Sequence, residues 1–336
     1  MAKAVKLSDI AAALNVSTVT VSKALADKQG VSEELREKIK MLAEEMGYRQ
    51  PSSIRMEKEV VSRNIGVLAS ERYLSQYTSF YWEMYQHVVT QGVKKECFCL
   101  LEVLSKNDES NLVQPKLLKG KKVEGLIIIG RIKKSYREFL NSTEQIPMVY
   151  LDFYDENRNN DAIISDSYYG MYLMTNYLFQ MGHRDIAYVG TLLATSSITD
   201  RYFGYAKAMM EHGVQIREEW IISDRDVETG EIEVELPERM PSAFVCNCDF
   251  VATAVIKKLQ DKSYRVPEDI SVVGFDNYLY PGLSDVGITT YEVDMKEMAR
   301  AGISMLLKKI NGDNYKGGIK IIEGRIVIKD SVKDIG

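Results

Sequence analysis

The stretch from Leu7 to Leu25, LSDIAAALNVSTVTVSKAL, constrains the fold of this chain more tightly than any other segment. Apolar side chains recur at helical spacing on both sides of a short corner, Asn15–Ser17. Asn tolerates the left-handed backbone that ends a helix, and Ser17 can cap the next helix through its hydroxyl. Two short helices joined by so tight a corner predict a helix-turn-helix, although a hairpin in an ordinary helical bundle would show the same spacing.

The residues after this stretch favour the helix-turn-helix. Its second helix exposes side chains short enough to let a helix lie deep in the major groove of DNA. A third helix is expected after Ser32, which can cap it, and Gly47 would end it. Three helices in about fifty residues form a core barely large enough to fold alone, so we expect them to be attached to a larger body.

These segments resemble the headpiece of the LacI/GalR family of bacterial transcription regulators. The resemblance rests on Asp9-Ile10-Ala11, Val16-Ser17-x-x-Thr20-Val21-Ser22-Lys23, Val31-Ser32 and Gly47-Tyr48. It implies a DNA-binding headpiece over residues 1–48. It also implies a homodimer that binds a pseudo-palindromic operator in double-stranded DNA.

The resemblance assigns roles to the exposed residues of the second helix. Thr18 and Val19 occupy the family's specificity positions, and Val19 suits contact with a thymine methyl group. Lys23 suits a guanine or a phosphate. Ser17, Thr20 and Ser22 are expected to hold the protein on phosphates.

Residues 49–63 are polar and contain Pro51 and two serines, which predicts a linker. In the family, the matching segment folds into a short hinge helix on DNA and inserts a leucine into the minor groove. This chain lacks that leucine and the proline-asparagine start of the segment. Ile54 or Met56 could replace the leucine, and a flexible tether without any inserted side chain is the alternative.

Charge is distributed unevenly along the 336 residues. The net charge is only -5, yet residues 1–28 carry four lysines against two acidic residues. This suits a small DNA-contacting end on a body that does not bind polyanions. The sequence contains neither an apolar N-terminal run nor a stretch long enough to span a membrane, so we expect a cytoplasmic protein without a membrane partner.

The four cysteines form two Cys-x-Cys pairs, Cys97/Cys99 and Cys246/Cys248. Both pairs lie in apolar runs that resemble strands, where alternate residues share a face. Zinc sites usually use Cys-x-x-Cys spacing, so structural thiols are favoured over a zinc site. We expect no metal, no cofactor and, in a reducing compartment, no disulfide.

From Asn64 onward, short apolar runs alternate with stretches of helical length. The runs are Ile65–Ala69, Phe98–Leu104, Val123–Ile129, Met148–Asp152, Ile186–Val189, Ala243–Cys248, Ile270–Phe275 and Ile288–Tyr291. This alternation predicts parallel sheets covered by helices on both faces. About ten strands are more than one compact sheet usually holds, so we expect residues 64–336 to form two α/β lobes.

The sequence lacks the common signatures of enzymes. No Gly-x-Gly-x-x-Gly follows the first strand, and no Walker loop, His-Glu-x-x-His or Gly-x-Ser-x-Gly occurs. The three histidines leave little material for metal or triad chemistry. We therefore expect no enzyme. The competing interpretation is a cytoplasmic solute-binding protein or an α/β enzyme that carries a helical extension.

The body also resembles the effector domain of the LacI/GalR family, which shares the type I fold of periplasmic sugar-binding proteins. The most specific segment is Val266–Asp276, VPEDISVVGFD. The resemblance implies that residues 64–336 bind a ligand and mediate dimerisation. It also implies three crossings of the chain between the lobes and a small ligand in the cleft between them.

A polyol in such a cleft needs carboxylate acceptors, a forked donor and aromatic faces. Ligands in open α/β sheets bind beyond the carboxyl ends of strands, where Asp166 and Asp276 lie. The candidate ligand-binding residues are Phe80, Tyr81, Asp166, Arg201, Arg225, Cys248 and Asp276. Asp166 could instead cap the next helix, and Arg225 could be a solvated surface residue.

The sequence therefore predicts a ligand-responsive DNA-binding regulator. We expect a repressor of carbohydrate-utilisation genes that a sugar or sugar derivative releases from its operator. A nucleobase or a phosphorylated effector is the alternative, and a phosphorylated ligand becomes plausible if Arg225 faces the cleft. The sequence leaves open whether the effector weakens or strengthens DNA binding.

Overall fold

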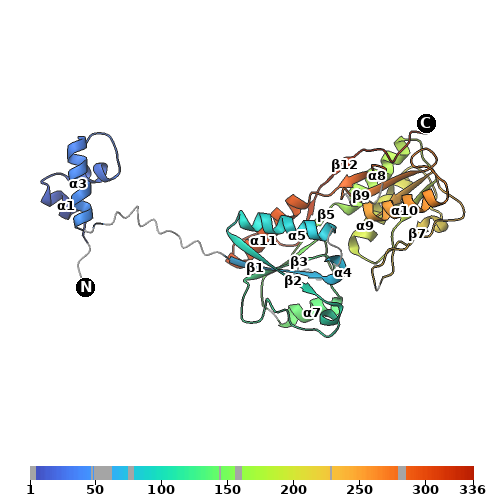
Figure 1. Cartoon of the computed structure of the whole chain (residues 1–336), viewed down its shortest axis with the longest axis horizontal. Coiled ribbons are helices and arrows are strands. Elements are labelled where there is room, and N and C mark those ends of the chain that lie inside the picture. Colours follow the sequence, from blue (N-terminus) through green and yellow to red (C-terminus); the bar gives the residue numbers. More distant parts are fainter. Residues whose placement is uncertain are drawn as a thin grey trace. The chain divides into compact units, whose positions relative to one another are not determined.

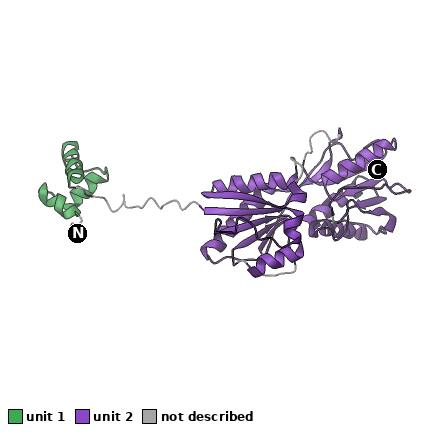
Figure 2. Cartoon of the chain, turned by 60° about the horizontal axis from the view of Figure 1, so that its bottom comes forward, with its two compact units in different colours: residues 1–61 green, residues 62–336 purple. Residues whose placement is uncertain are grey.

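The computed structural model describes residues 5–46, 48, 63–74, 79–143, 145–155, 161–227, 229–278 and 285–336. The chain forms two compact units, residues 1–61 and 62–336 (Figure 2). Nearly all of the expected linker, including Ile54 and Met56, lies outside the described residues. Among the residues that are described, no helix combines the length and apolar character needed to cross a membrane.

The described part of the first unit contains three helices, α1 (Leu7–Ala13), α2 (Thr18–Leu25) and α3 (Glu33–Glu45). Asn15 takes the left-handed conformation at the corner, with φ of 50°. The Ser17 hydroxyl accepts a hydrogen bond from the Thr20 amide at 3.0 Å and so caps α2. Ser32 precedes α3 but makes no capping hydrogen bond through its side chain. The core consists of Ile10, Ala11, Val21, Ala24, Ile39 and Ala43.

The second unit contains two six-stranded sheets, each the centre of one lobe. The sheet of the first lobe has the order β11-β5-β4-β3-β1-β2, and all its described pairings are parallel. Its strands are β1 (Arg63–Ser70), β2 (Cys97–Leu104), β3 (Gly125–Ile129), β4 (Met148–Leu151), β5 (Asp161–Ser165) and β11 (Ile319–Ile322).

The sheet of the second lobe has the order β12-β10-β9-β8-β6-β7. Its strands are β6 (Ile186–Val189), β7 (Ile221–Ile222), β8 (Ala243–Cys246), β9 (Ser271–Asp276), β10 (Thr289–Glu292) and β12 (Arg325–Val327). The pairing of β12 with β10 is antiparallel, and the other described pairings are parallel.

Helices cover both faces of each sheet (Figure 1). In the first lobe α5 (Phe80–Val93) and α11 (Met295–Asn311) pack on one face and α7 (Lys134–Thr143) on the other. In the second lobe α8 (Ser167–Gln180) and α9 (Ser196–Glu211) lie opposite α10 (Asp249–Asp261). The described residues also include the short helices α4 (Glu71–Leu74), α6 (Lys106–Ser110) and η1 (Glu218–Trp220).

Strand β3 shows how the two-sided burial arises. Ile127 and Ile129 join the apolar cluster under α5 and α11, while Leu126 and Ile128 join the cluster under α7. Alternate side chains point to opposite faces of a strand, so a strand buried on both faces must be apolar throughout. The expected fold of a helical headpiece followed by two parallel α/β lobes is therefore confirmed.

The strand predictions failed in two kinds of place. Strands β7, β11 and β12 were not expected, because β7 has only two residues, β11 exposes three of its four side chains, and β12 has three residues of which none is fully buried. The run expected to reach Cys248 ends as a strand at Cys246. Cys248 is instead the residue that precedes α10.

The chain crosses between the lobes three times, as expected. The crossings lie at Asp166, at Val293–Asp294 and at Glu323–Gly324. Asp166 and Asp294 cap the helices that follow them, and their backbones match closely, with φ/ψ of -76°/70° and -78°/74°. The first two crossings are thus built alike.

Candidate nucleic-acid interface and ligand cleft

Five of the six residues predicted to contact DNA are exposed on α2 or on the residue that caps it, Ser17. Ser17, Thr18, Val19, Ser22 and Lys23 are exposed, whereas Thr20 is half-buried. Val19 leaves 61% of its surface exposed. Such a side chain is available for apolar contact with a partner.

Two interactions fix the position of α2 from its ends. The hydroxyls of Ser17 and Thr20 lie 2.8 Å apart at its start. At its end, the buried Arg36 of α3 donates to Asp27 at 3.3 Å and to the Lys28 carbonyl at 3.0 Å, which holds the loop between α2 and α3. Arg36 was not singled out from the sequence, because an arginine on a mostly charged helix resembles a surface residue.

A cavity of about 760 Å³ lies between the lobes of the second unit. Six of the seven predicted ligand-binding residues line it, namely Phe80, Tyr81, Arg201, Arg225, Cys248 and Asp276. Asp166 is not among the lining residues, and its carboxylate accepts a hydrogen bond from the Tyr169 amide at 3.1 Å. The structure therefore gives Asp166 the helix-capping geometry that was its alternative interpretation.

The first lobe supplies an aromatic wall. The rings of Tyr73 and Tyr81 lie 4.5 Å apart, and Phe80 meets Tyr81 edge to face at 5.3 Å. The Tyr81 hydroxyl donates to Asp152 at 2.9 Å, and burial raises the pKa of Tyr81 well above its usual value, so the hydroxyl stays protonated. Gly130, with φ of 71°, allows this packing, because a Cβ there would lie 2.9 Å from the Tyr73 ring.

The second lobe supplies a buried arginine. Arg201 donates to the Asn247 carbonyl at 2.6 Å and to Asp276 at 3.2 Å. Its guanidinium lies over Phe275 at 3.8 Å from the ring centroid, and the residue is only 4% exposed. Its Nε is buried without a hydrogen-bond partner in the described part of the chain. An unpaired buried donor beside a cavity suits a ligand acceptor.

Asp276 is held in a strained backbone conformation. Its φ is 103°, which is rare for a residue other than glycine and costs on the order of 1–3 kcal/mol. Burial raises the pKa of Asp276 to about 7, and the nearby Arg201 guanidinium opposes this rise. Strain of this kind persists where the surrounding structure fixes a residue, as in a ligand clamp.

Arg225 is held in the cavity wall by a polar network. Its Nε and Nη2 donate to the fully buried Asp224 at 2.9 and 2.6 Å. Asp224 also accepts hydrogen bonds from the Thr191 amide at 2.7 Å and from the Asn247 side chain at 2.9 Å. Although burial opposes ionisation, the hydrogen bonds and charge of Arg225 lower the pKa of Asp224. Arg225 is thus an oriented cation and not a solvated surface residue.

Sequence reasoning missed the residue that joins the two arginines. Asn247 accepts from Arg201 through its carbonyl and from Arg225 through its side chain, the latter at 3.3 Å. Its position at the carboxyl end of β8, between Cys246 and Cys248, was the available signal. Arg72, Tyr73 and Phe250 also line the cavity and were not expected there.

The cysteines are free thiols. Cys97 and Cys99 lie on β2, and Cys246 is buried at the end of β8. Cys248 lines the cavity, and burial raises the pKa of its thiol to about 12. Within the described ranges, no group of three His, Cys, Asp or Glu side chains is arranged to hold a metal ion.

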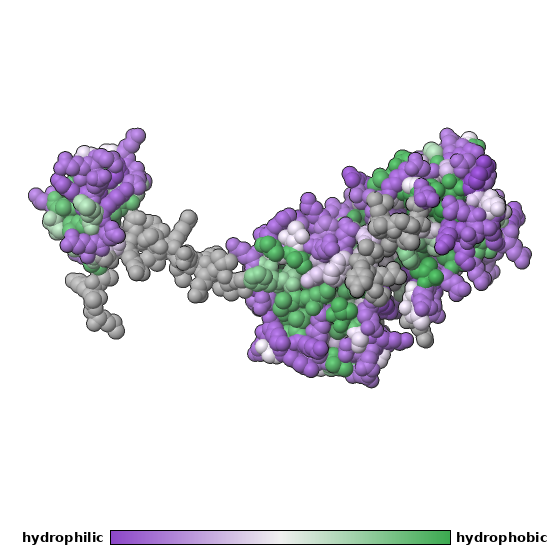
Figure 3. Space-filling model, viewed as in Figure 1, coloured by the Kyte–Doolittle hydropathy of each residue, from purple (hydrophilic) through white to green (hydrophobic). Residues whose placement is uncertain are grey.

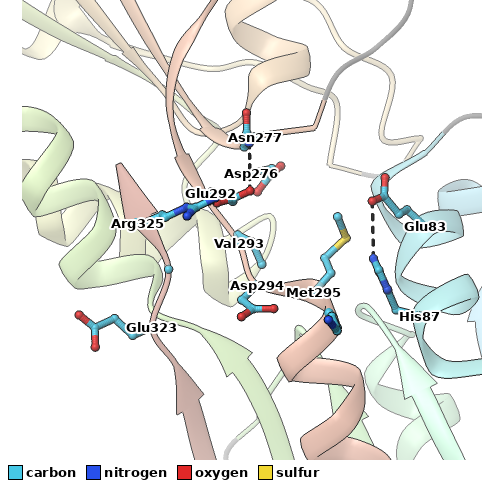
Figure 4. A pocket seen from close by; sticks show the side chains of 12 residues that line it. Glu83, His87, Asp276, Asn277, Glu292, Val293, Asp294, Met295, Glu323 and Arg325 are labelled. Atoms are coloured by element: carbon cyan, nitrogen blue, oxygen red, sulfur yellow. Dashed lines mark hydrogen bonds and ion pairs between the residues drawn. The ribbon is translucent and has the colours of Figure 1, made fainter. Parts of the chain in front are cut away.

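A second cavity of about 460 Å³ lies beside two of the crossings (Figure 4). Its walls include Glu292–Lys296 and Glu323–Arg325, and His87 faces Glu83 at 3.6 Å on α5. Asn277 donates to Glu292 at 3.2 Å, and Glu292 pairs with Arg325. Asp276 lines both this cavity and the cleft, so one residue connects the ligand cleft to the crossings.

Two family models match the chain. Residues 6–51 match a model described as bacterial regulatory proteins of the lacI family, and residues 175–332 match a periplasmic binding protein-like domain. The first match covers the described headpiece, and the second covers most of the second lobe together with α11 and β11.

Curated relatives match the chain over nearly its whole length. The HTH-type transcriptional repressor PurR of Vibrio campbellii is 26% identical over 98% of this chain and 99% of its own. The protein of the same name from Vibrio atlanticus is 28% identical over 98% of this chain and 99% of its own.

Solved structures share the fold. The transcriptional regulator CelR in complex with cellobiose has a TM-score of 0.70 and 20% identity, covering 97% of this chain and 99% of its own. The lac repressor dimer bound to operator and the anti-inducer ONPF has a TM-score of 0.66 and 21% identity, covering 98% and 100%. A regulator from Alkaliphilus metalliredigens in complex with D-xylulofuranose has a TM-score of 0.64 and 20% identity, covering 81% and 99%.

Proposed function

The chain belongs to the lacI family of bacterial regulatory proteins, and we propose that it is a homodimeric repressor whose operator affinity falls when a sugar or sugar derivative binds between its lobes. Its class is that of a DNA-binding transcription regulator and not of an enzyme. We propose three features in addition to that class: the type of effector, the direction of its effect on operator affinity, and the homodimer.

The cavity between the lobes is the observation that carries the proposal. One wall offers the faces of Phe80 and Tyr81, which suit the C–H surfaces of a sugar ring. The other offers Arg201 and Asp276, a forked donor beside an acceptor, which suit neighbouring hydroxyls. The volume of about 760 Å³ is in the usual range for small-ligand sites.

The exposed surface of α2 supports the assignment of DNA-contacting roles. Thr18 and Val19 are proposed to read base edges in the major groove, and Lys23 a guanine or a phosphate. Ser17, Thr20 and Ser22 are proposed to fix the position of the helix on phosphates. Because Thr20 is half-buried, it is expected to contribute less to the phosphate contacts than Ser17 and Ser22.

An apolar strip on the first lobe supports a homodimer. Val93, Phe98, Leu100 and Val103 expose between 39% and 62% of their surfaces along β2 and the end of α5. Figure 3 shows apolar side chains gathered over the part of the first lobe where Figure 1 labels β2. β2 is an edge strand, and an exposed apolar edge of this kind usually has a partner. A dimer carries two headpieces, so a pseudo-palindromic operator is expected.

Regulation requires that the ligand distinguishes two arrangements of the lobes. We infer that a ligand on Asp276 changes the angle between the lobes through the crossings that Asp276 adjoins. A changed angle would alter the spacing of the two headpieces in a dimer, and with it the operator affinity.

A flat nucleobase is the second candidate effector. Phe80 and Phe250 both line the cavity, and aromatic side chains can stack on a planar ring. A phosphorylated ligand is the third candidate, supported by Arg72 and Arg225 in the same cavity. A nucleobase differs from a neutral sugar in shape, and a phosphorylated ligand differs from it in charge. A single panel of ligands therefore distinguishes the three candidate effectors.

A thermal-shift screen of sugars, sugar phosphates and nucleobases tests the effector class. A binding sugar is expected to raise Tm and to release the full-length protein from an operator selected from random duplexes, as measured by mobility shift. Arg201→Ala should keep operator binding and lose the response, whereas the exposed Arg265→Ala should behave like wild type. A protein that prefers no duplex over random DNA would contradict the proposal.

A further inference from the structure

Two side chains of the first lobe reach across to the second lobe beside the ligand cavity. Arg131, just after β3, donates through Nη1 to the Leu193 carbonyl at 3.2 Å and also to the Ala194 carbonyl. Tyr154, just after β4, donates its hydroxyl to the Asp200 carboxylate, 3.0 Å from each oxygen. We call these two contacts the interlobe latch. Both end on the same part of the second lobe, the loop that enters α9 and the first turns of that helix.

The first-lobe half of the latch is fixed by its neighbours. Arg72, which lines the cavity, donates to the Arg131 carbonyl at 2.7 Å. Arg131 follows Gly130, whose positive φ turns the chain at the end of β3. The Arg131 side chain is therefore directed from a rigid strand end and does not hang from a long loop.

The second-lobe half is fixed as well. Leu193 takes a left-handed conformation with φ of 66°, and its amide donates to the Thr199 hydroxyl at 2.9 Å. Thr195 caps α9 by accepting from the Ile198 amide at 3.1 Å. The carbonyls that receive Arg131 are thus held in place before any contact with the first lobe.

The same turns of α9 form part of the cavity wall. Thr195, Ser197, Ile198 and Arg201 line the cavity, and Asp200 stands next to Arg201 in the chain. The lobes cannot separate at this end of the cleft without breaking both latch contacts. We propose that Arg131 and Tyr154 stabilise this closed arrangement of the lobes against an open one.

The latch sets the populations of the closed and open arrangements. A ligand that binds one arrangement more tightly than the other therefore has an apparent affinity that depends on the latch. The identity of the ligand rests on the proposed function, whereas the closed arrangement of the lobes rests only on the two latch contacts. The latch can therefore be tested without knowing the ligand or the operator.

Cys248 is a native reporter of opening. It lines the cavity, is half-buried, and has a thiol pKa raised to about 12 by burial. Since the thiolate is the reactive form, N-ethylmaleimide should modify Cys248 slowly in the closed state and faster when the cleft opens. Cys246 lies two residues earlier and is fully buried in the sheet, so its modification requires unfolding. Both cysteines fall in the same peptide in mass spectrometry, which makes Cys246 an internal control.

The experiment measures the rate of modification of each cysteine by mass spectrometry in the full-length protein without DNA. The variants are Tyr154→Phe, Arg131→Gln and their combination. We expect Cys248 to react about tenfold faster in each single variant and on the order of a hundredfold faster in the double variant, since each loses a hydrogen bond that involves a charged group. The rate at Cys246 should stay unchanged.

Tyr172→Phe is the matched control. Its hydroxyl donates to Glu211 at 2.7 Å, which is the same chemistry as the Tyr154 contact but lies between α8 and α9 within one lobe. This variant should leave Cys248 at the wild-type rate.

Three outcomes would overturn the latch. The double variant could react at the wild-type rate, or Cys246 could accelerate in parallel with Cys248, or wild-type Cys248 could already react as fast as an exposed thiol. None of these outcomes bears on whether a sugar or any other effector binds. Conversely, a ligand screen without hits leaves a positive latch result standing.

Discussion

The headpiece and the body obtain their functional surfaces in opposite ways. In the headpiece, the predicted DNA contacts lie on one helix of eight residues and on the residue that caps it, above a core of six buried side chains. In the body, the cavity draws its walls from segments as far apart as Arg72 and Asp276, which only the assembled sheets bring together. A local surface is easy to recognise in a sequence and easy to lose by unfolding. A surface built from distant segments is hard to recognise but well supported.

The largest difference should appear when one core side chain is removed from each unit. Ile10→Ala is expected to unfold the headpiece, because a buried Ile→Ala change costs about 2–5 kcal/mol and a core this small has little more to lose. Operator binding should disappear while calorimetry still shows the melting transition of the body.

Ile127→Ala in β3 is the matched change in the body. It should lower the melting temperature of the body while the headpiece signal and operator binding at room temperature persist. If Ile10→Ala also lowered the melting temperature of the body, the two units would not be independent.

The second prediction concerns the polar network that only the body possesses. Asp224→Asn should destabilise the body by about 3 kcal/mol in urea unfolding, because it leaves Arg225 in the cavity wall without its counter-charge. Adding Arg225→Met should recover most of that loss, since the unpaired charge is then gone. If the double variant lost as much unfolding free energy as the two single variants together, this explanation would be contradicted.

The third prediction separates base reading from phosphate contact on α2. Val19→Ala should weaken the binding free energy for the selected operator by about 1–3 kcal/mol. The loss should be much smaller for an operator changed at the base pair that Val19 contacts. Fluorescence anisotropy with both duplexes measures this difference. Equal losses on the two duplexes would show that Val19 reads no base.

Lys23→Ala serves as the comparison. If Lys23 contacts a phosphate, the variant should lose affinity on every duplex and reduce the salt dependence of binding by about one ion per headpiece. If it contacts a guanine, the loss should concentrate on the selected operator.

The smallest effect is expected from pH. His183 is 2% exposed, lies 3.0 Å from the Ser242 hydroxyl and 3.1 Å from the Lys333 carbonyl, and has a pKa lowered by burial. The unfolded chain therefore binds this proton more readily, so His183 should contribute a loss of stability as the pH falls from about 6.5 toward its folded pKa, whereas the raised pKa of Asp276 contributes in the opposite direction. The headpiece contains no histidine and should not share this change.

His183→Gln should raise the melting temperature of the body at about pH 5.5 relative to its value at about pH 7.5, when compared with the same two values for wild type. The variant also removes two hydrogen bonds, so its melting temperature at the higher pH provides the baseline. An unchanged pH dependence would mean that His183 is protonated in the folded state or that other groups dominate.

The difference between the two regions also explains what the sequence could predict. The corner Asn15–Ser17 and the apolar runs of the sheets are local signals, and both produced the expected elements. Phe80, Arg201 and Asp276 were found through resemblance to known motifs. Asn247 was missed because its role depends on two arginines that reach it from other segments. Asp166 was ambiguous because a strand end beside a helix supports both capping and ligand contact.

The most direct test of the account is the coupling between the cleft and α2. Operator affinity should be measured by anisotropy with and without the ligand that gives the largest thermal shift, and ligand affinity with and without operator. The account predicts that each changes the other by the same factor, of about fivefold or more, and that Arg201→Ala abolishes both changes. A ligand that binds the cleft tightly while operator affinity stays constant would contradict it.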